Sequence, residues 1–530
     1  MIFTYNTNSR CFICTFVVHA DNSNQSANIL AIFSYTFSTP YLVVKPYIKA
    51  LIAKGHNVTV ISSVNLLPDI DGVRHIRAAA LDQVIDHIIN FEFDTDVLTN
   101  KWKEGSLSAR FHYNISRSIL SDVKVQSLLK DQSEHFDMVV LEPTHSDALI
   151  GFAEHFNAPQ VGLSAIGCSW LVDYQAGNSA PSVYRPISPM GYSRGKSLVD
   201  KWNNWIYITE EWMMDRLVYL PGQLELFVSY FSFPPEKFYE RRRNFSLMLI
   251  NQHFSLGRVR SNVPNVIEVG GMHMAEPSVP LEPELLDFLN GAEHGAIYFS
   301  LGMEILNKWL PKNMEQTMLQ TFSQLKQRVV WKHEMETMPN KSDNIYLSSM
   351  ASQRQLLEHP NVKLFITHGG LLSLIEAAYS GVPMLGLPIY FDQFDNVERM
   401  QQAGVALSMD FNAVTAEQLT HNIKELLENP CYALKAKELS ARFRDQPTSP
   451  LERAVWWTEY VLRHKGAPHM RMAEHEMGFV PYYRIHFIAI LYGRIAIAAF
   501  ILIFVTFMVV NCVLKELRRI FGPPVFYTAL

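Results

Sequence analysis

Cysteine is scarce in this chain, which has only five among 530 residues. Cys11 and Cys14 fall in an apolar stretch near the N-terminus, and Cys512 falls in an apolar run near the C-terminus. Cys168 and Cys431 are far apart in the sequence, so a disulfide framework is not indicated and both are expected to be buried thiols. The fold must therefore be held by packed cores, and the length implies at least two of them.

The chain also lacks a surplus of basic charge. Lysine and arginine number 46 against 51 aspartates and glutamates, which gives a formal net charge of -5 and a pI near 6.4. Because the charges are mixed and form no basic stripe, nucleic acid is not an expected partner. The longest basic cluster, Arg241 to Arg243, is interpreted as a solvated helix end or turn. No internal repeat or low-complexity tract is present.

What the chain does have is an alternation of short apolar runs with helical patterns, which is typical of parallel α/β sheets. It occurs twice, in two series separated by the proline-rich stretch 276–284. The first series is predicted to contain strands at 28–33, 57–62, 137–142 and 160–163, with helices at 42–54 and ending near Phe156. The second is predicted to contain strands at 296–301, 328–331 and 362–367, with helices at 316–326 and 371–379. The predicted fold class is α/β, with two doubly wound domains facing a cleft and ligands at the carboxyl ends of the strands.

The most informative segment runs from Phe365 to Gln393 and reads FITHGGLLSLIEAAYSGVPMLGLPIYFDQ. Gly369 and Gly370 let a buried strand turn sharply into a helix. The free N–H groups and the positive dipole end of that helix favour a diphosphate, and His368 adds a donor at the same place.

Further polar side chains follow on this helix and beyond the next strand. Ser373 and Glu376 lie three residues apart, which places them on one helix face. The carboxylate can accept hydrogen bonds from both hydroxyls of a ribose, whereas Asp392 and Gln393 can read the hydroxyls of a hexose. The segment therefore predicts a nucleotide-sugar site.

At this point the sequence resembles a known family, the UDP-glycosyltransferases of the membrane-bound animal type. The residues that match the family signature, with every spacer of the required length, are Phe-Ile-Thr-His-Gly-Gly, Ser373, Glu376, Pro383, Pro388, Asp392 and Gln393. The resemblance covers nearly the whole chain and implies the GT-B fold. It also implies a UDP-sugar as co-substrate, with no other cofactor and no metal ion.

The resemblance assigns further donor contacts. Gln353 occupies the place of a glutamine whose amide pairs with the uracil edge, and Ser300 and Gly302 end a strand close to the phosphates. Met303 departs from the family pattern, which usually has serine there. Lys332 is a candidate cation for the carboxylate of a glucuronate donor, although a lysine at a strand end is more often solvated.

The acceptor side departs from the family in a way that touches the mechanism. Inverting transfer needs a base for the acceptor hydroxyl, and relatives use a histidine that a carboxylate orients. Glu142 fills the carboxylate position, but counting back from Pro46 places Pro40 where the histidine is expected. Proline cannot take a proton, so the ordinary pair of residues is absent.

Three interpretations remain open. The first is an active enzyme that uses Glu142 itself, with a pKa raised by burial, or His145 three residues further on. The second is transfer to acidic acceptors such as carboxylates or phenols, which need little help from a base. The third is a protein of the same fold that binds a UDP-sugar or an apolar ligand without turning it over. The complete donor signature favours an enzyme that transfers a hexose, glucose in most invertebrate-type relatives, to a small lipophilic acceptor with inversion.

Both ends of the chain carry apolar segments. The run 495–514 has 20 residues without a charge, is about 30 Å long as a helix and is interpreted as a transmembrane helix. Lys515, Arg518 and Arg519 follow it and give a weak positive-inside bias. The short apolar stretch 11–18 is interpreted as the core of a signal peptide, and a buried N-terminal strand is the alternative.

These features predict a single-pass type I protein of the endoplasmic reticulum membrane with its bulk in the lumen. Glycosylation triplets begin at Asn24, Asn114, Asn244 and Asn340. The predicted segments are a signal peptide (1–23), an N-terminal acceptor-binding domain (24–265), a C-terminal UDP-sugar-binding domain (266–445), a return helix with a juxtamembrane segment (446–486), a transmembrane helix (487–514) and a cytosolic tail (515–530). The expected partners are a UDP-sugar, a small lipophilic acceptor and the lipid bilayer, with a homo-oligomer as a further option.

Overall fold

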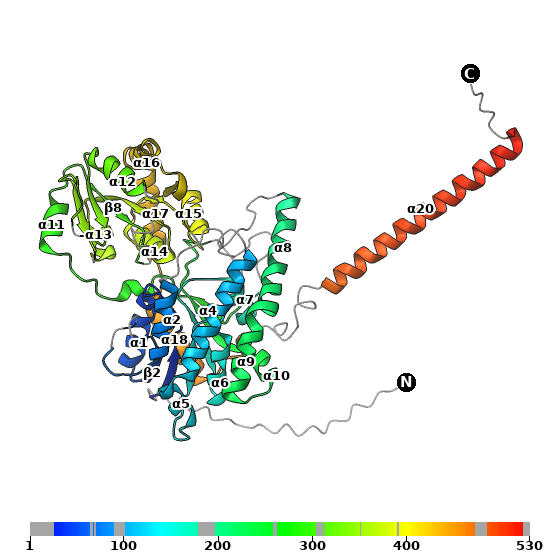
Figure 1. Ribbon diagram of the computed structural model, residues 1–530, viewed down its shortest axis with the longest axis horizontal. Helices are drawn as coiled ribbons and strands as arrows, with labels where there is room; N and C mark the ends of the chain where they lie inside the picture. Colours follow the sequence, from blue (N-terminus) through cyan, green and yellow to red (C-terminus); the bar gives the residue numbers. More distant parts are fainter. Residues whose placement is uncertain are drawn as a thin grey trace, which may run out of the picture.

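The computed structural model describes residues 26–522 except 36, 64–66, 68–69, 90–100, 179–196, 258–261, 304–309, 311–312, 336, 350, 390–391 and 472–484. The predicted signal peptide and the triplet at Asn24 lie outside the described residues. Within them the chain forms two parallel sheets, each flanked by helices, and one long helix that extends away from both (Figure 1).

The first sheet has seven parallel strands in the order β3-β2-β1-β4-β5-β6-β7. They are β1 (Asn28–Ile32), β2 (Asn57–Ser62), β3 (Val73–Arg77), β4 (Met138–Leu141), β5 (Gln160–Ser164), β6 (Phe245–Ile250) and β7 (Val266–Glu268). The central strands are short apolar runs, as a parallel sheet covered on both faces requires. Successive residues of β1 enter different cores, because Ile29 and Ala31 pack on one face and Leu30 and Ile32 on the other.

The second sheet has six parallel strands in the order β10-β9-β8-β11-β12-β13. They are β8 (Ala296–Ser300), β9 (Arg328–Lys332), β10 (Ile345–Ser348), β11 (Val362–Thr367), β12 (Met384–Gly386) and β13 (Ala406–Ser408). Tyr298 and Phe365 stack on one face, with ring centroids 5.0 Å apart, while Ile297 and Phe299 belong to a separate core on the other face. The second sheet therefore has its own pair of cores and forms a second domain.

Helices occupy both sides of each sheet (Figure 1). The first domain contains α1 (Tyr41–Ala53), α2 (Ala79–Ile89), α4 (Lys101–Ser121), α5 (Val123–Lys130), η1 (Asp147–Ile150), α6 (Gly151–His155), α7 (Trp170–Ala176), α8 (Leu198–Met214), η2 (Asp215–Tyr219), α9 (Leu220–Phe231) and α10 (Pro235–Arg242). The segments that follow are η3 (Met272–Ala275), α11 (Pro283–Asn290), α12 (Met314–Ser323), α13 (Gln353–Glu358), α14 (Leu371–Ser380), α15 (Gln393–Gln402), η5 (Phe411–Ala413), α16 (Ala416–Glu428), α17 (Pro430–Arg444), α18 (Pro450–Arg463), η6 (Pro468–Met470) and α20 (Ile485–Phe521).

In each sheet the strand order reverses once, beside the first strand of the domain. The first sheet is built outwards from β1 to β3 and then continues with β4 on the other side of β1, and β8 and β11 have the same relation in the second sheet. The loops after two such strands diverge and leave a crevice for ligands. Glu142 follows β4 and His368 follows β11, so the two halves of the predicted site both lie at such a reversal.

The connection between the domains extends the first sheet further than predicted. β7 begins at Val266, beyond the predicted boundary between residues 265 and 266, yet it pairs with β6 in the first sheet. The first sheet therefore ends at Glu268, and η3 and the proline-rich stretch lead from there to α11.

After the second domain the chain returns to the first. α18 begins with Pro450 at its first turn and with a capping box between Ser449 and Glu452. The helix packs against α1, where the Thr458 and Tyr47 hydroxyls are hydrogen-bonded at 2.8 Å. The chain thus crosses between the domains twice, at η3 and at α18.

α20 is 37 residues long and contains the whole predicted span 487–514. Among the described residues it is the one helix long and apolar enough to cross a membrane. It extends away from both domains in Figure 1, and its last turns carry Arg518 and Arg519.

The structure overturns two predictions about burial. Arg242, predicted with its neighbours to be solvated, is 1% exposed because its guanidinium lies between two buried carboxylates. Cys431, predicted to be a buried thiol, is exposed at the start of α17, and Cys168 is half-buried. The burial of Arg242 depends on partners from distant parts of the chain, and the exposure of Cys431 on its place at the solvent-facing start of α17, and a local sequence pattern reports neither.

Candidate functional site

The turn between β11 and α14 requires both of its glycines. Gly369 has a φ of +87°, and a Cβ there would lie 2.3 Å from the Val397 side chain. A Cβ on Gly370 would lie 2.5 Å from Nε2 of His368. Gly370 is the N-cap of α14 and supplies no side-chain cap, so the first N–H groups of the helix point into the turn without a side-chain acceptor. Such a helix start favours an anion.

His368 lies beside this helix start with its side chain buried. Burial, followed by the nearby charge of Lys332, lowers the pKa of His368 to about 4. The imidazole is therefore neutral near pH 7 and offers one N–H donor. Lys332 Nζ donates to the Gly302 carbonyl oxygen at 2.8 Å. A donor, a cation and a helix N-terminus thus meet at one point, which suits a diphosphate.

Ser300 and Gly302 complete this edge from β8. The Gly302 N–H donates to Ser300 Oγ at 3.2 Å, and Gly302 has a φ of +92°. A Cβ at this position would lie 2.8 Å from Cε1 of the His368 ring. The structure thus brings Ser300 and Gly302 to His368, and Met303 follows them with an exposed side chain. The predicted role of Ser300 and Gly302 at the phosphates stays a prediction.

Gln353, Ser373 and Glu376 form a second cluster on facing helices. Gln353 Nε2 donates to Ser373 Oγ at 3.1 Å and to Glu376 Oε2 at 2.8 Å. Gln353 opens α13, while Ser373 and Glu376 lie on the buried face of α14, one turn apart. The predicted role of Gln353 at the uracil edge is not tested by these contacts, which show its amide nitrogen fixing one oxygen of the carboxylate.

Asp392 and Gln393 lie at the start of α15. Asp392 Oδ2 accepts from Asn396 Nδ2 at 2.7 Å, and burial raises the pKa of Asp392 to about 6. Gln393 Oε1 accepts from the Ile389 N–H at 2.8 Å. Asn396 Nδ2 also donates to the Gly369 carbonyl oxygen at 3.1 Å, which ties this pair to the glycine turn. Asn396 was not among the predicted site residues, although its i,i+4 spacing from Asp392 places both on one helix face.

On the acceptor side, Glu142 is held by Ser34. The Ser34 N–H donates to Glu142 Oε2 at 2.9 Å and the Ser34 hydroxyl to the same atom at 2.8 Å. Burial raises the pKa of Glu142 to about 8, although the Ser34 hydrogen bonds oppose the shift. The carboxyl group is therefore mostly protonated at pH 7 and becomes a base as the pH passes about 8.

The loop that carries Ser34 is fixed from several directions. The Tyr35 hydroxyl donates to the Leu163 carbonyl oxygen at 3.0 Å, and the Tyr41 hydroxyl donates to the Tyr35 carbonyl oxygen at 3.2 Å. Pro40 is the N-cap of α1, with helical backbone angles and a buried side chain. The position predicted for the catalytic histidine thus lies at a helix start in the loop that contacts Glu142.

His145 lies in a buried cluster at the head of η1. Its ring stacks on Tyr219 with centroids 3.6 Å apart and meets His112 edge-on at 5.6 Å. Burial, then the charges of His112 and Arg242, hold the pKa of His145 well below its usual range. His145 is therefore neutral, as a proton acceptor must be. Its low pKa also makes it a weak base, so it is a poor alternative to Glu142.

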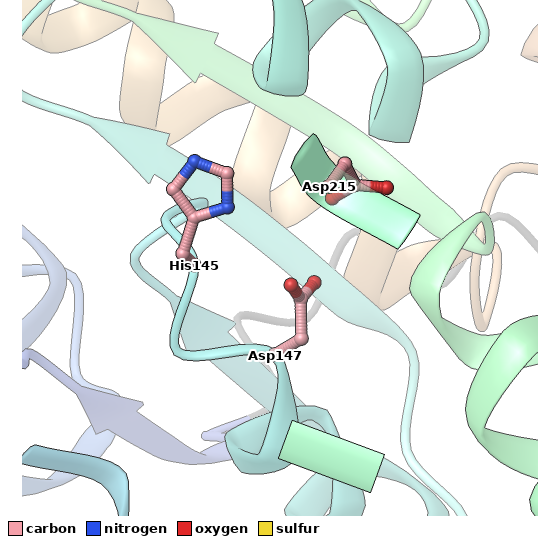
Figure 2. Close-up of side chains that lie close together, drawn as sticks. All are labelled: His145, Asp147 and Asp215. Atoms are coloured by element: carbon pink, nitrogen blue, oxygen red, sulfur yellow. The ribbon is translucent and has the colours of Figure 1, made fainter. Parts of the chain in front are cut away.

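His145, Asp147 and Asp215 also offer ligand atoms within 4.8 Å of one another, as metal ligands would (Figure 2). The cluster already holds a cation, because Arg242 Nε donates to Asp147 Oδ1 at 2.8 Å and Arg242 Nη1 to Asp215 Oδ2 at 3.0 Å. A guanidinium between the two carboxylates neutralises the charge that would attract a metal ion. We therefore interpret the cluster as a buried ion network that supports η1 and η2.

The chain as a whole matches a known family. A family model described as UDP-glucoronosyl and UDP-glucosyl transferase matches residues 31–521. The chain belongs to this family. Membership supports transfer of a sugar from a UDP-sugar to an acceptor.

Relatives within the family are similar over most of their length. UDP-glycosyltransferase UGT5 of Dactylopius coccus is 32% identical over 473 residues, which cover 88% of this chain and 89% of the relative. UDP-glucosyltransferase 2 of the same species is 30% identical and covers 85% of this chain and 87% of the relative. UDP-glucuronosyltransferase 2B13 of Oryctolagus cuniculus is 29% identical, with 91% and 92% covered.

Solved structures confirm the predicted GT-B fold. The glycosyltransferase VinC in complex with dTDP has a TM-score of 0.56 at 16% identity, with 82% of this chain and 100% of that chain covered. The spinosyn forosaminyltransferase SpnP has a TM-score of 0.55 at 16% identity, with 83% and 100% covered. In both comparisons the likeness spans the two parallel-sheet domains of this UDP-glycosyltransferase family member.

Proposed function

We propose that this protein transfers glucose from UDP-glucose to a small lipophilic acceptor with inversion at the anomeric carbon. Binding of the UDP-sugar is supported by the junction of β11 and α14. There His368 and Lys332 lie beside a helix start that has no side-chain cap. The Gln353–Glu376 pair next to it offers a fixed carboxylate for the ribose. A nucleoside diphosphate needs both features, since it carries a charged end and a hydroxyl-rich one.

In the proposed reaction the acceptor oxygen attacks the anomeric carbon while the bond from that carbon to the diphosphate oxygen breaks. UDP leaves with the electron pair, and His368 and the start of α14 stabilise its growing charge. The acceptor proton passes to a base, for which Glu142 and His145 are the candidates. No metal ion is required in this scheme, because neutral donors and a helix terminus take the charge.

The choice of glucose rests on two supporting observations. A relative named a glucosyltransferase is 30% identical. Lys332, the candidate cation for a sugar carboxylate, bonds the Gly302 carbonyl oxygen beside His368, where the diphosphate is expected. A panel of UDP-glucose, UDP-glucuronate and UDP-galactose with phenolic acceptors, scored for free UDP and conjugate, tests this choice directly, and preferential turnover of UDP-glucuronate would contradict it.

The donor site is tested by His368→Ala and Glu376→Ala. Each variant loses a hydrogen bond in which one partner is charged, the diphosphate for His368 and the carboxylate for Glu376. The affinity for UDP should therefore fall by about 10- to 100-fold, or about 1.5–3 kcal/mol. Calorimetry with the full-length protein in detergent measures this, and Glu438→Ala on the exposed face of α17 is the matched control. UDP affinities equal to that of the wild type in both variants would rule out this donor site.

A second function is favoured by the state of Glu142. A carboxyl group with a pKa of about 8 is mostly protonated at pH 7, and the loop that contacts it has proline where a histidine is expected. A protein that binds a UDP-sugar and turns it over slowly or not at all fits these two facts. The Pro40 variants in the Discussion separate this function from catalysis.

We also propose that α20 anchors the protein in the endoplasmic reticulum membrane with both domains in the lumen. The basic residues at the end of α20 support a cytosolic C-terminus. The full chain should resist alkaline extraction, and deletion of residues 485–530 should release it. Asn340 is exposed with a φ of +61° and should carry a glycan that Asn340→Gln removes. The proposal would be contradicted if alkali released the full chain into the supernatant and glycosidase treatment left its electrophoretic mobility unchanged.

A further inference from the structure

A segment between the two domains is clamped onto the donor helices. We call residues 272–278, which comprise η3 and the three residues after it, the strap. Arg354 Nη1 on α13 donates to the carbonyl oxygens of Met274 and Glu276, each at 2.7 Å. On the other side, Lys49 Nζ on α1 lies 2.9 Å from Glu276 Oε2. The strap is thus held between the first domain and the α13–α14 face.

The strap places His273 against the ribose-binding carboxylate. His273 Nε2 lies 3.5 Å from Glu376 Oε1, while Gln353 Nε2 holds Glu376 Oε2 at 2.8 Å. His273 is 8% exposed, and neither of its ring nitrogens has a hydrogen-bond partner within the part of the chain that the structure describes. Glu376 therefore has one oxygen fixed by an amide and the other facing an imidazole.

This arrangement is incomplete without a further polar group. A buried imidazole that makes no hydrogen bond forfeits its solvation, so such groups normally have partners. A separation of 3.5 Å is longer than a good N–H···O bond, for which about 2.7–3.2 Å is usual. A hydroxyl group satisfies both sides, because it accepts from the imidazole N–H and donates to the carboxylate.

We infer that His273 is a further donor-site residue, which together with Glu376 binds a ribose hydroxyl of the UDP-sugar. The inference rests on the donor site proposed above. His273 reaches that site from the strap, which connects the two domains, and not from the second sheet. The ribose is therefore bound between the strap and α14. Because a pair built to bind a hydroxyl rejects an analogue that lacks it, His273 should also contribute to the preference for ribonucleotides.

The test compares UDP with 2′-deoxy-UDP and 3′-deoxy-UDP by calorimetry on the full-length protein in detergent. His273→Ala should weaken UDP about tenfold and leave the analogue that lacks the bound hydroxyl nearly unchanged, so that the preference for UDP over that analogue collapses. In turnover assays the KM for the UDP-sugar should rise by a similar factor while kcat stays within about twofold. A merely structural role would change the three nucleotides alike.

Further variants make the result decisive. His273→Gln keeps an N–H near the position of Nε2 and should retain most of the preference. His273→Leu fills the space without an N–H, should lose the preference, and replaces His273→Ala if that variant does not fold. His359→Ala, which alters a histidine just before β11 at the opposite end of the strand, should bind UDP as the wild type does.

The outcomes separate this inference from the proposed function. If His368→Ala weakens UDP binding but His273→Ala, or His273→Leu in its place, keeps the wild-type preference over the deoxy analogues, the role of His273 is wrong and the donor site stands. If the wild-type protein binds no UDP at all, the donor site itself is wrong. If all three nucleotides weaken together in folded His273 variants, His273 only supports the strap.

Discussion

Replacing Arg242 with alanine is expected to lower the free energy of unfolding of the first domain by about 3–5 kcal/mol. The substitution leaves Asp147 and Asp215 in a buried site without a countercharge, and burial already raises the pKa of both carboxyls. The loss should shrink as the pH falls towards the pKa of an unfolded aspartate. Below that pH the carboxyls are protonated in both the folded and unfolded states and no longer need the guanidinium.

Urea unfolding of the full-length protein in detergent, followed by tryptophan fluorescence, measures this loss. Arg74→Ala is the matched control, because the Arg74 side chain is 55% exposed and pairs with Glu134 on the same domain. It should cost at most about 1 kcal/mol. Combining Arg242→Met with Asp147→Asn and Asp215→Asn leaves no charge buried and should recover much of the stability. An Arg242→Ala protein as stable as the Arg74→Ala control would show that the ion network does not hold η1, η2 and α10 together.

The burial of Arg242 could not be predicted from the sequence. Three consecutive arginines at a helix end are ordinarily solvated, and nothing within α10 indicates otherwise. The partners of Arg242 come from η1, 95 residues earlier, and from η2, 27 residues earlier. A pairing between distant segments of one chain leaves no local pattern, so only the folded structure reveals it.

Local features were predictable because their causes are local. The strands β2 and β11 have the predicted bounds, and α14 ends one residue later than predicted. Each is a short apolar run bounded by glycine or polar residues, which fixes both its type and its ends. The sequence of strand, turn and helix at β11 and α14 could be predicted for the same reason, since the three follow one another within about 20 residues. By contrast, β7 is only three residues long and gave no signal.

The pairing of Ser34 with Glu142 depends on the sheet and not on the sequence of either loop. β1 and β4 lie side by side, with Ile32 opposite Leu141, so the residues just beyond the two strand ends must meet. The count back from Pro46 leads to Pro40, whereas the residue that meets Glu142 is Ser34, two residues beyond the end of β1. A predicted adjacency of β1 and β4 would have pointed to Ser34.

Substituting Pro40 with histidine is expected to raise transfer to alcohol acceptors by about 10² to 10⁴, or roughly 3–5 kcal/mol. The resemblance to the family places a base at this position, and Pro40 starts α1 in the loop that contacts Glu142. The backbone tolerates the change, because Pro40 has ordinary helical angles and its carbonyl oxygen accepts from the Val43 N–H at 3.0 Å. Thr39→His tests the neighbouring position, which the count back from Pro46 gives if it is shifted by one residue.

The pH dependence distinguishes the possible bases. If Glu142 is the base in the wild type, transfer should increase as the pH rises through about 8, where its carboxyl group loses its proton. A histidine oriented by Glu142 should move this rise towards the ordinary histidine range, near pH 6.5. Glu142→Ala in the Pro40→His background should remove most of the gain, because the imidazole loses the group that orients it.

Pro40→Ala is the matched control, since it removes the proline ring without adding a base, and it should leave the rate near that of the wild type. Acidic phenols give up their proton readily, so their transfer should gain less than that of alcohols from the same histidine. A uniform gain for both acceptor classes would indicate a change in binding instead. If neither histidine variant accelerates transfer to alcohols while UDP-sugar still binds, the loop after β1 does not carry the base, and the second proposed function, binding without turnover, becomes the better account of Glu142.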